Sequence, residues 1–235
     1  SDIEIEDIEV SKITEQYLAY IQKQEEPERY RRWRSRPEAS YGKMKGRVRR
    51  ELRNSLLTEQ GFVCCFCGCA IGRKESDTTV TQIYPLSSDA HNIHNAHIIP
   101  QSVAPQLSLD YGNICASCDS SDSNEKHCDE AQRNLELPVT PLQEDCISFF
   151  SFDSTGTINA NEDKSQEDQE KACQTIDILK LNSKILQEKR ESMLQECMSI
   201  PEDYFDSAME NLKQRDEKER FAPFYFVALR YFGKI

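Results

Sequence analysis

The sequence lacks a long hydrophobic run and a secretory leader. No stretch of about 18 apolar residues occurs in the chain, so we expect no transmembrane helix and no membrane partner. The first residues, Ser1–Asp7, contain neither the basic nor the apolar region of a signal peptide, which predicts a cytoplasmic protein. Hydrophobic residues make up only 37 % of the 235, but nine tyrosines and ten phenylalanines favour a folded chain over a disordered one.

The net charge of −12 argues against a nucleic-acid partner only if it is spread evenly, and it is not. Residues 28–54 hold eleven basic side chains against three acidic ones, so this window is +8 and the rest of the chain is −20. Tyr30, Trp33 and Tyr41 lie among the arginines, a mixture that suits phosphate contacts and base stacking. The alternative is a solvated helical face that pairs with the acidic remainder. The candidate nucleic-acid-binding residues are Arg31, Arg32, Arg34, Lys43, Lys45 and, further along the chain, Arg133.

Cysteine and histidine are concentrated in one part of the chain. Seven of the ten cysteines lie between residues 64 and 128, and all four histidines lie between 91 and 127. A disulfide framework requires an oxidising compartment, whereas clustered cysteines in a cytoplasmic chain more often bind a metal ion.

Two C-x2-C pairs within this part indicate a structural zinc site. Cys64 with Cys67 and Cys115 with Cys118 each place two thiolates on a tight turn, where both can reach one tetrahedral ion. The fourth ligand stays open at this point, because Cys128 competes with Cys115. Free cysteine is often a small buried hydrophobe, which is the alternative for Cys115.

Hydrophobic periodicity and turn residues predict an α+β fold, mostly helical, with a small metal-bound centre that contains β-strands. We expect three regions: a helical region with the basic arm at 1–60, the Cys/His core at 61–135, and a hairpin followed by helices at 136–235. The expected elements are helices at 7–26 and 42–60, a strand at 79–84, a hairpin at 149–158, a linker at 159–170 and helices from 172 onward, including 203–214 and 223–232.

A second pattern lies between the cysteine pairs. His97 is followed sixteen residues later by Asn113, and Asp119 directly follows Cys118. A histidine, an asparagine and a metal-ligand side chain beside a zinc knuckle is the pattern of an HNH (ββα-metal) nuclease. We expect a strand to present His97, a loop to bring Asn113 beside it, and a short helix beginning near Cys118 to present Asp119. Each residue also has an ordinary structural alternative: a buried histidine, a turn asparagine and a helix N-cap.

The chain resembles the HNH endonucleases of Septu-type and retron-associated bacterial anti-phage systems over residues 28–195. The matching motifs are Leu57-x-x-Gln60-Gly61-x-x-Cys64-x-x-Cys67-Gly68, His97-Ile98-x-Pro100-Gln101-Ser102, Leu109-Asp110-Tyr111-x-Asn113-Ile114-x-Ala116-Ser117-Cys118-Asp119 and His127-Cys128-Asp129.

This resemblance implies a ββα-metal (HNH) core that is stapled by zinc, with a role for each motif residue. His97 would be the general base, Asn113 would orient that histidine or its loop, and Asp119 would bind a catalytic Mg²⁺ or Mn²⁺. Cys64, Cys67 and Cys118 would bind zinc, and the family pattern favours Cys128 over Cys115 as the fourth ligand.

One residue departs from the family pattern. Many HNH enzymes have Asp or Glu directly before the histidine, where it helps to hold the catalytic ion, but here that residue is Ala96. The ion would then be held by Asp119 and water, or His94 or Asp89 would substitute, or the activity would be weak.

The resemblance also implies a partner ATPase in a bacterial defence complex. The chain has no P-loop motif of its own, so ATP binding would be the partner's task. DNA is the expected substrate ahead of RNA. The alternatives are a nuclease that acts on RNA and a non-catalytic zinc module that binds nucleic acid or protein, the latter favoured by Ala96.

Overall fold

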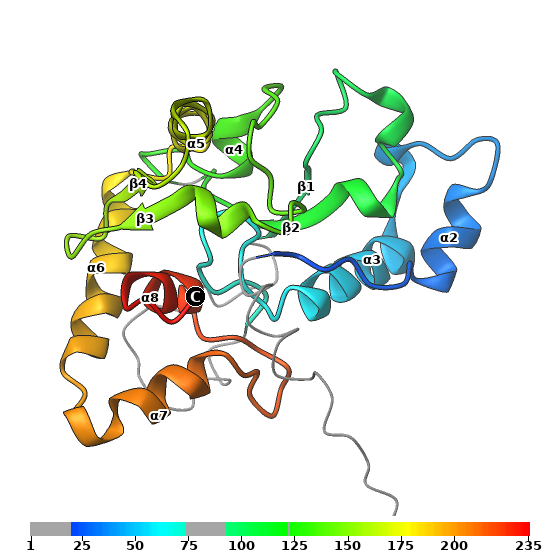
Figure 1. Cartoon of the computed structure of the whole chain (residues 1–235). Helices are drawn as coiled ribbons and strands as arrows, with labels where there is room; N and C mark the ends of the chain where they lie inside the picture. Colours follow the sequence, from blue (N-terminus) through cyan, green and yellow to red (C-terminus); the bar gives the residue numbers. More distant parts are fainter. Residues whose placement is uncertain (1–19, 74–92, 122) are drawn as a thin grey trace, which may run out of the picture.

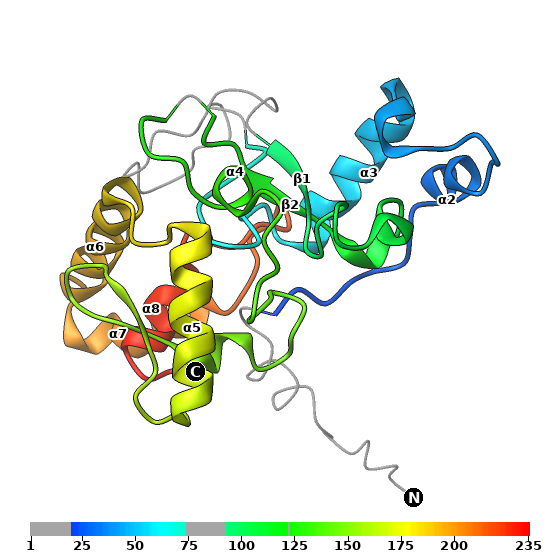
Figure 2. The same ribbon diagram turned by 90° about the horizontal axis from the view of Figure 1, so that it is seen from above.

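The computed structural model describes residues 20–73, 93–121 and 123–235, which combine helices with two small antiparallel sheets, as the α+β prediction states. The longer helices are α3 (Gly46–Glu59), α5 (Gln166–Leu179), α6 (Lys184–Met198) and α7 (Glu202–Leu212), and the shorter ones are α2 (Glu28–Arg34), α4 (Asp129–Gln132) and α8 (Tyr225–Tyr231). The strands are β1 (Ile93–His97), β2 (Ile114–Cys118), β3 (Phe150–Phe152) and β4 (Ile158–Ala160). Two views place α2 and α3 on one side of the β1–β2 pair and helices α5 to α8 on the other (Figures 1 and 2).

Helix α3 follows the predicted periodicity and positions the first cysteine pair. Leu52, Leu56 and Leu57 on its inner face are buried. Gly61 has φ +62°, a conformation that favours glycine, and a Cβ there would lie 2.3 Å from the Phe221 ring. The helix therefore ends at this glycine, as predicted, and the chain turns directly into the Cys64–Cys67 segment.

The β1–β2 pair carries most of the motif residues. His97 pairs with Ile114, Ala96 with Cys115 and Ile93 with Cys118. The prediction of a helix beginning near Cys118 is wrong, because Cys118 is the last residue of β2 and the next described helix, α4, begins at Asp129. The backbone of residues 114–118 is extended because it pairs with β1, which lies about 20 residues earlier in the sequence.

The C-terminal region holds the predicted hairpin and helices with shifted boundaries. Strands β3 and β4 pair through the expected turn, in which Gly156 has φ +76°. The predicted linker at 159–170 is too long: β4 continues to Ala160, and α5 begins after Ser165, whose hydroxyl accepts a hydrogen bond from the Asp168 backbone N–H at 3.2 Å. None of the helices in the described ranges is long and apolar enough to cross a membrane.

The predicted helix at 7–26 is wrong over its described part. Residues 20–26 are not helical, and the Ile21 backbone N–H instead donates to the Pro141 carbonyl at 2.9 Å. Residues 7–19 and the predicted strand at 79–84 lie outside the described residues. A single hydrophobic cluster includes Leu52 of α3, Cys64 of the first cysteine pair and Leu186 of α6, so one core runs through all three sequence regions.

Candidate functional site

Four cysteines from three separate segments meet in the core. The Sγ atoms of Cys64, Cys67, Cys118 and Cys128 lie within 4.8 Å of one another, and all four side chains are buried. The Sγ atoms of Cys67 and Cys118 are 3.9 Å apart, close to the roughly 3.8 Å that Zn–S bonds of about 2.3 Å require at tetrahedral angles. The donor set, its burial and its spacing fit a structural zinc ion.

The backbone around these thiols is arranged as in a ligand turn. The Cys118 N–H approaches the Cys64 Sγ at 3.3 Å and the Phe66 N–H approaches it at 3.5 Å, which is the direction of donation that stabilises a thiolate. Although burial opposes ionisation, contacts with the thiols of Cys118 and Cys128 hold the pKa of Cys64 below its ordinary value. His127 lies against the same cluster, with its Nδ1 3.3 Å from the Cys128 Sγ.

Cys115 lies outside this group of four cysteines. It is fully buried, faces Ala96 across the β1–β2 pair, and belongs to a small apolar cluster with Ile21 and Ile98. Cys115 and Cys118 are three residues apart on a strand, so their side chains point to opposite faces. The structure therefore groups Cys128, rather than Cys115, with the other three thiols.

A buried arginine of α6 joins this helix to the β3–β4 turn and to the α5–α6 connection. Arg190 is 2 % exposed and donates to the carbonyls of Gly156 at 2.5 Å and Leu181 at 2.7 Å. The carbonyl of Leu179, the last residue of α5, accepts a hydrogen bond from the Cys128 backbone N–H at 2.9 Å. The charges of Cys67 and Cys128 act on the Arg190 guanidinium, whose pKa is lowered by burial to about 10 and raised by these two thiols. A guanidinium in this position would offset negative charge on the four thiols if they bind a metal ion as thiolates.

His97, at the end of β1, is held in one tautomer. Its Nε2 lies 2.9 Å from the Ser108 carbonyl oxygen, which can only accept, so Nε2 carries the proton and Nδ1 has the lone pair. The Gln101 side-chain amide donates to Nδ1 at 3.3 Å, and the Tyr41 ring packs edge-on at 4.6 Å between centroids. Burial lowers the pKa of His97, against the opposing effects of the Ser108 carbonyl and Asp129. The imidazole is therefore neutral at pH 7, as a general base must be.

Asn113 positions the loop after His97 and does not contact the imidazole. Its Oδ1 accepts the Ile99 N–H at 2.8 Å, and its Nδ2 donates to the carbonyls of Ile99 at 3.0 Å and Leu107 at 3.4 Å. The side chain thus ties together both ends of the loop that carries Ser108, the residue that orients His97.

Asp119 lies in a second group of polar side chains, around His94. The His94 Nε2 is 3.4 Å from the Asp119 Oδ2, and its Nδ1 is 2.9 Å from the Glu130 Oε1 and 3.3 Å from the Asp129 Oδ2. Asp119, Glu130 and His94 each offer one atom to a common point, with the three atoms within 4.8 Å. The contact with Asp129 raises the pKa of His94. One imidazole and two carboxylates are a plausible donor set for a divalent ion.

The two groups of side chains lie on opposite faces of β1, because His94 and His97 are three residues apart on the strand. They are nevertheless electrostatically connected through Asp129, which contacts His94 and whose charge also acts on His97 and Tyr41. Ala96, on the same face as His94, is fully buried and has no donor atom. His94 is therefore placed to supply the ligand that Ala96 lacks, whereas Asp89 lies outside the described residues.

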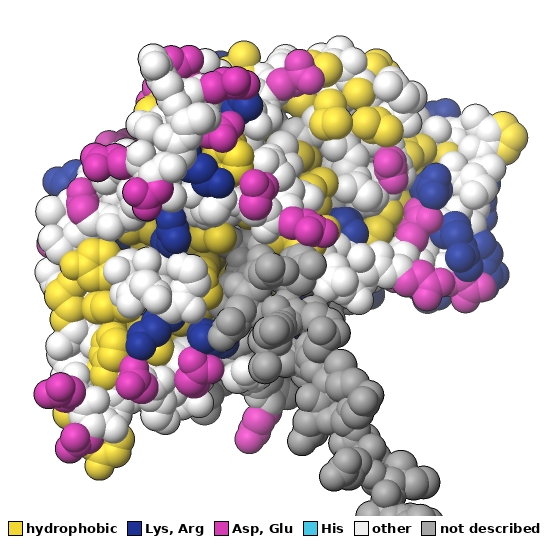
Figure 3. All heavy atoms as spheres, viewed as in Figure 1, with side chains coloured by type: hydrophobic (Ala, Val, Ile, Leu, Met, Phe, Trp, Pro, Cys, Tyr) yellow, Lys and Arg dark blue, Asp and Glu magenta, His cyan; other side chains and the backbone are white. Residues whose placement is uncertain are grey.

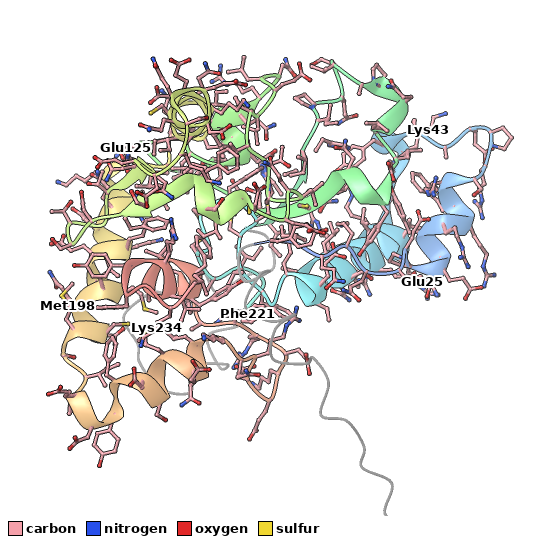
Figure 4. The ribbon with its side chains drawn as sticks, in the orientation of Figure 1. Glu25, Lys43, Glu125, Met198, Phe221 and Lys234 are labelled. Carbon is pink, nitrogen blue, oxygen red and sulfur yellow. The ribbon has the colours of Figure 1, made fainter. Side chains whose placement is uncertain are left out.

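The predicted nucleic-acid-binding residues are dispersed, and several already have acidic partners. Basic side chains gather over α2, but acidic ones lie directly beside them (Figure 3). Arg32 pairs with Glu28 and Arg34 with Glu26, while Arg31 lies 4.0 Å from Glu25. Among the described residues, no carboxylate pairs with the exposed side chains of Lys43, Lys45 or Arg133. Lys43 and Glu25 mark opposite edges of the α2–α3 part of the molecule (Figure 4).

Two features of the site were not singled out in the sequence. Glu130 directly follows the His127-Cys128-Asp129 motif, and a second acidic residue beside a predicted zinc ligand is the signal that points to it. Arg49 and Arg53 were only part of the basic window, although their spacing of four places them on one helical face.

No protein-family model matches the chain. The chain is 27 % identical over 156 residues to a protein of Vibrio cholerae serotype O1 biovar El Tor that is named "Retron Vc95 putative HNH endonuclease"; the match covers 65 % of this chain and 68 % of that protein. This distant likeness supports the prediction of an HNH-type nuclease in general terms.

Proposed function

We propose that the protein is a metal-dependent HNH endonuclease that hydrolyses phosphodiester bonds in DNA. The observation that carries the proposal is His97: a neutral imidazole whose Nε2 donates to the Ser108 carbonyl and whose Nδ1 has the lone pair, at the end of a strand that also bears His94. His94 is grouped with Asp119 and Glu130 as possible metal ligands. The likeness to an HNH endonuclease supports the same reaction.

In the proposed mechanism, the attacking water displaces the Gln101 amide from the Nδ1 of His97, and His97 takes a proton from this water at Nδ1. The Ser108 carbonyl keeps the ring oriented and stabilises the imidazolium that forms. Asn113 has an indirect role, because it holds the loop that carries Ser108. Asp119, His94 and Glu130 would hold the divalent ion, Mg²⁺ or Mn²⁺, and the mixed nitrogen and oxygen donor set favours Mn²⁺. Such an ion supplies charge stabilisation for the scissile phosphate and the leaving oxygen.

We propose that Cys64, Cys67, Cys118 and Cys128 hold a structural Zn²⁺. These residues come from the turn after α3, the end of β2 and the residue before α4. The ion would join three segments that have little hydrophobic area of their own. It would thereby fix the position of α4 relative to the β1–β2 pair. In this proposal the core at 61–135 performs the chemistry, and the regions at 1–60 and 136–235 bind nucleic acid and partners.

The decisive experiment compares the intact protein with its His97→Ala variant on labelled duplex DNA, with Mn²⁺ or Mg²⁺ added. Loss of a general base costs about a hundredfold or more in rate. Glu202→Ala, which changes an exposed side chain at the start of α7, is the matched control and is expected to keep full activity. Equal cleavage by the His97→Ala variant contradicts the mechanism. Zinc binding and DNA binding without any cleavage would favour a non-catalytic zinc module, and selective cleavage of RNA would reassign the substrate.

We further propose that the protein acts in the bacterial cytoplasm as the nuclease subunit of a Septu-type or retron-associated defence complex, with a P-loop ATPase as its partner. Exposed apolar side chains at Met198, 46 % exposed, and Tyr204 make the α6–α7 corner a candidate contact with that partner (Figure 4). Co-purification of the ATPase encoded beside this protein is expected to fail with Met198→Asp/Tyr204→Asp and to survive with Glu136→Gln. Equal co-purification by both would move the contact elsewhere.

A further inference from the structure

Helix α3 presents arginines on two sides. Arg47 and Arg50 are exposed and line an open hollow together with Glu51. Arg49 and Arg53 are one turn apart on another side of the helix and are only half exposed. Like charges at this spacing repel each other, so their proximity is unfavourable unless an anion lies between them.

Arg49 and Arg53 have almost no partners in the described part of the chain. The Nε atoms of both are buried and have no hydrogen-bond acceptor there, and no carboxylate there forms an ion pair with either guanidinium. The one hydrogen bond that either guanidinium makes with the described residues joins the Arg53 Nη2 to the Ile93 carbonyl, at a long 3.4 Å. Within the described part of the chain, these two partly desolvated cations thus lack a counter-charge, which makes them a candidate site for an anion.

This pair of arginines lies on the His97 side of β1. Ile93, Asn95 and His97 have their side chains on one face of the strand. Arg53 donates to the backbone carbonyl of Ile93, at the start of this strand. The positive charges of both arginines act on Tyr41, against the effect of its burial, and the Tyr41 ring packs against the His97 ring. Asn95 also has a buried Oδ1 without a hydrogen-bond donor among the described residues.

We propose that Arg49 and Arg53 form a phosphate-binding site that holds the nucleic-acid backbone beside His97. The planar fork of a guanidinium matches the geometry of a phosphate, and two of them offset its charge as well as each other's repulsion. That the bound strand is the one cut at His97 rests on the proposed nuclease function, whereas the anion site itself does not. The site replaces the exposed residues of α2 as the main phosphate contact, because Arg32 and Arg34 are paired with glutamates.

The test uses two double variants that remove the same charge from the same helix. Arg49→Gln/Arg53→Gln and the control Arg47→Gln/Arg50→Gln are titrated with fluorescent duplex DNA over a range of salt concentrations, without added divalent ions. The first variant is expected to bind DNA roughly tenfold or more weakly than the intact protein. The slope of log K against log salt is expected to be less negative by about 1.8, as for two lost phosphate contacts. The control is expected to change less. Equal losses in both variants overturn the proposal, because they indicate general charge attraction.

Two further measurements separate the alternatives. Without ligand, Arg49→Gln/Arg53→Gln is expected to have an unchanged or higher Tm, since it relieves repulsion; a lower Tm would make the arginines structural and overturn the proposal. Inorganic phosphate that raises the Tm of the intact protein, with DNA affinity unaffected by the substitutions, would assign the site to a free anion and contradict the nucleic-acid assignment. If the arginines govern DNA affinity but the intact protein never cuts DNA with Mn²⁺, the nuclease proposal fails and the phosphate site stands.

Discussion

The Nε2 of His97 and the carbonyl oxygen of Ser108, 2.9 Å apart, determine which imidazole nitrogen can act as a base. Because a carbonyl oxygen only accepts, the proton resides on Nε2, and the reactive lone pair is on Nδ1. The contact depends on Asn113, whose side chain closes the intervening loop at Ile99 and Leu107. The asparagine of the motif therefore acts through a main-chain carbonyl and not through the histidine itself.

The pH profile of cleavage follows from the environment of His97. Burial lowers its pKa below the ordinary value of 6.5, and the base is active only when neutral. As the pH falls, kcat/KM should therefore decline with a midpoint below pH 6.5, with one proton involved. Measurement between about pH 5 and about pH 8, within the stability range of the Cys₄ site, checks this. The measurement uses saturating Mn²⁺, so that protonation of His94 does not limit metal binding. Under that condition, a decline that is centred above 6.5 contradicts the assignment of His97 as the base.

Metal dependence should respond to Glu130. Glu130→Gln removes a charged donor from the group with His94 and Asp119 but keeps the side-chain size. The Mn²⁺ concentration for half-maximal cleavage should rise roughly tenfold or more, as for loss of a tuned ligand contact. Glu136→Gln, an exposed carboxylate on the following segment, is the control and should leave the titration unchanged. An identical titration curve for Glu130→Gln would remove this residue from the site.

The two candidate fourth ligands are distinguished by zinc content. Cys128→Ser should lose zinc during purification and unfold at a much lower temperature, since a structural ion contributes directly to folding. Cys115→Ser should keep its zinc and lose only about 1–3 kcal/mol of stability, because it buries a hydroxyl among Ile21 and Ile98. Metal analysis by mass spectrometry, with thermal unfolding, gives both values. The reverse pattern would make Cys115 the ligand.

Arg190 should influence how firmly zinc is held. Arg190→Met leaves the carbonyls of Gly156 and Leu181 without their donor and removes a cation beside the thiols. We expect the free energy of unfolding to fall by about 3 kcal/mol or more, and zinc to be released faster to a chromogenic chelator. Lys184→Met on the same helix, which breaks only an exposed pair with Glu188 at 3.7 Å, should release zinc at the original rate. Unchanged release by Arg190→Met would limit its role to hydrogen bonding.

Features with short sequence spacing could be predicted, and those that depend on distant partners could not. The Cys64–Cys67 turn, the end of α3 at Gly61 and the β3–β4 hairpin are determined by neighbouring residues, and each was expected. The strand at Cys118 was predicted as a helix because its partner, β1, is remote in sequence. Ile21 shows the same effect: its spacing is helical, but its N–H pairs with Pro141.

The same distinction between near and distant sequence partners applies to the candidate site. His97, Asn113 and Asp119 were found by motif, but the group around His94 and Glu130 exists only once β1 and α4 pack together. The sequence also does not reveal the partner of a charged side chain. It predicts Arg32 and Arg34 as phosphate contacts, but the structure pairs both with glutamates. Whether a cation is neutralised depends on tertiary packing, which composition does not record.

The turn that carries Cys64 and Cys67 is closed by a segment far along the chain. The Phe221 N–H donates to the Gly61 carbonyl at 2.9 Å, and the Phe224 N–H donates to the Gly68 carbonyl at 2.8 Å. During translation both thiols are exposed to the solvent long before these donors are synthesised. Contacts of such high sequence separation form late and slowly. The nascent chain would therefore bind the metal ion before the core closes. The ion would first act as a folding nucleus and would then stabilise the folded structure.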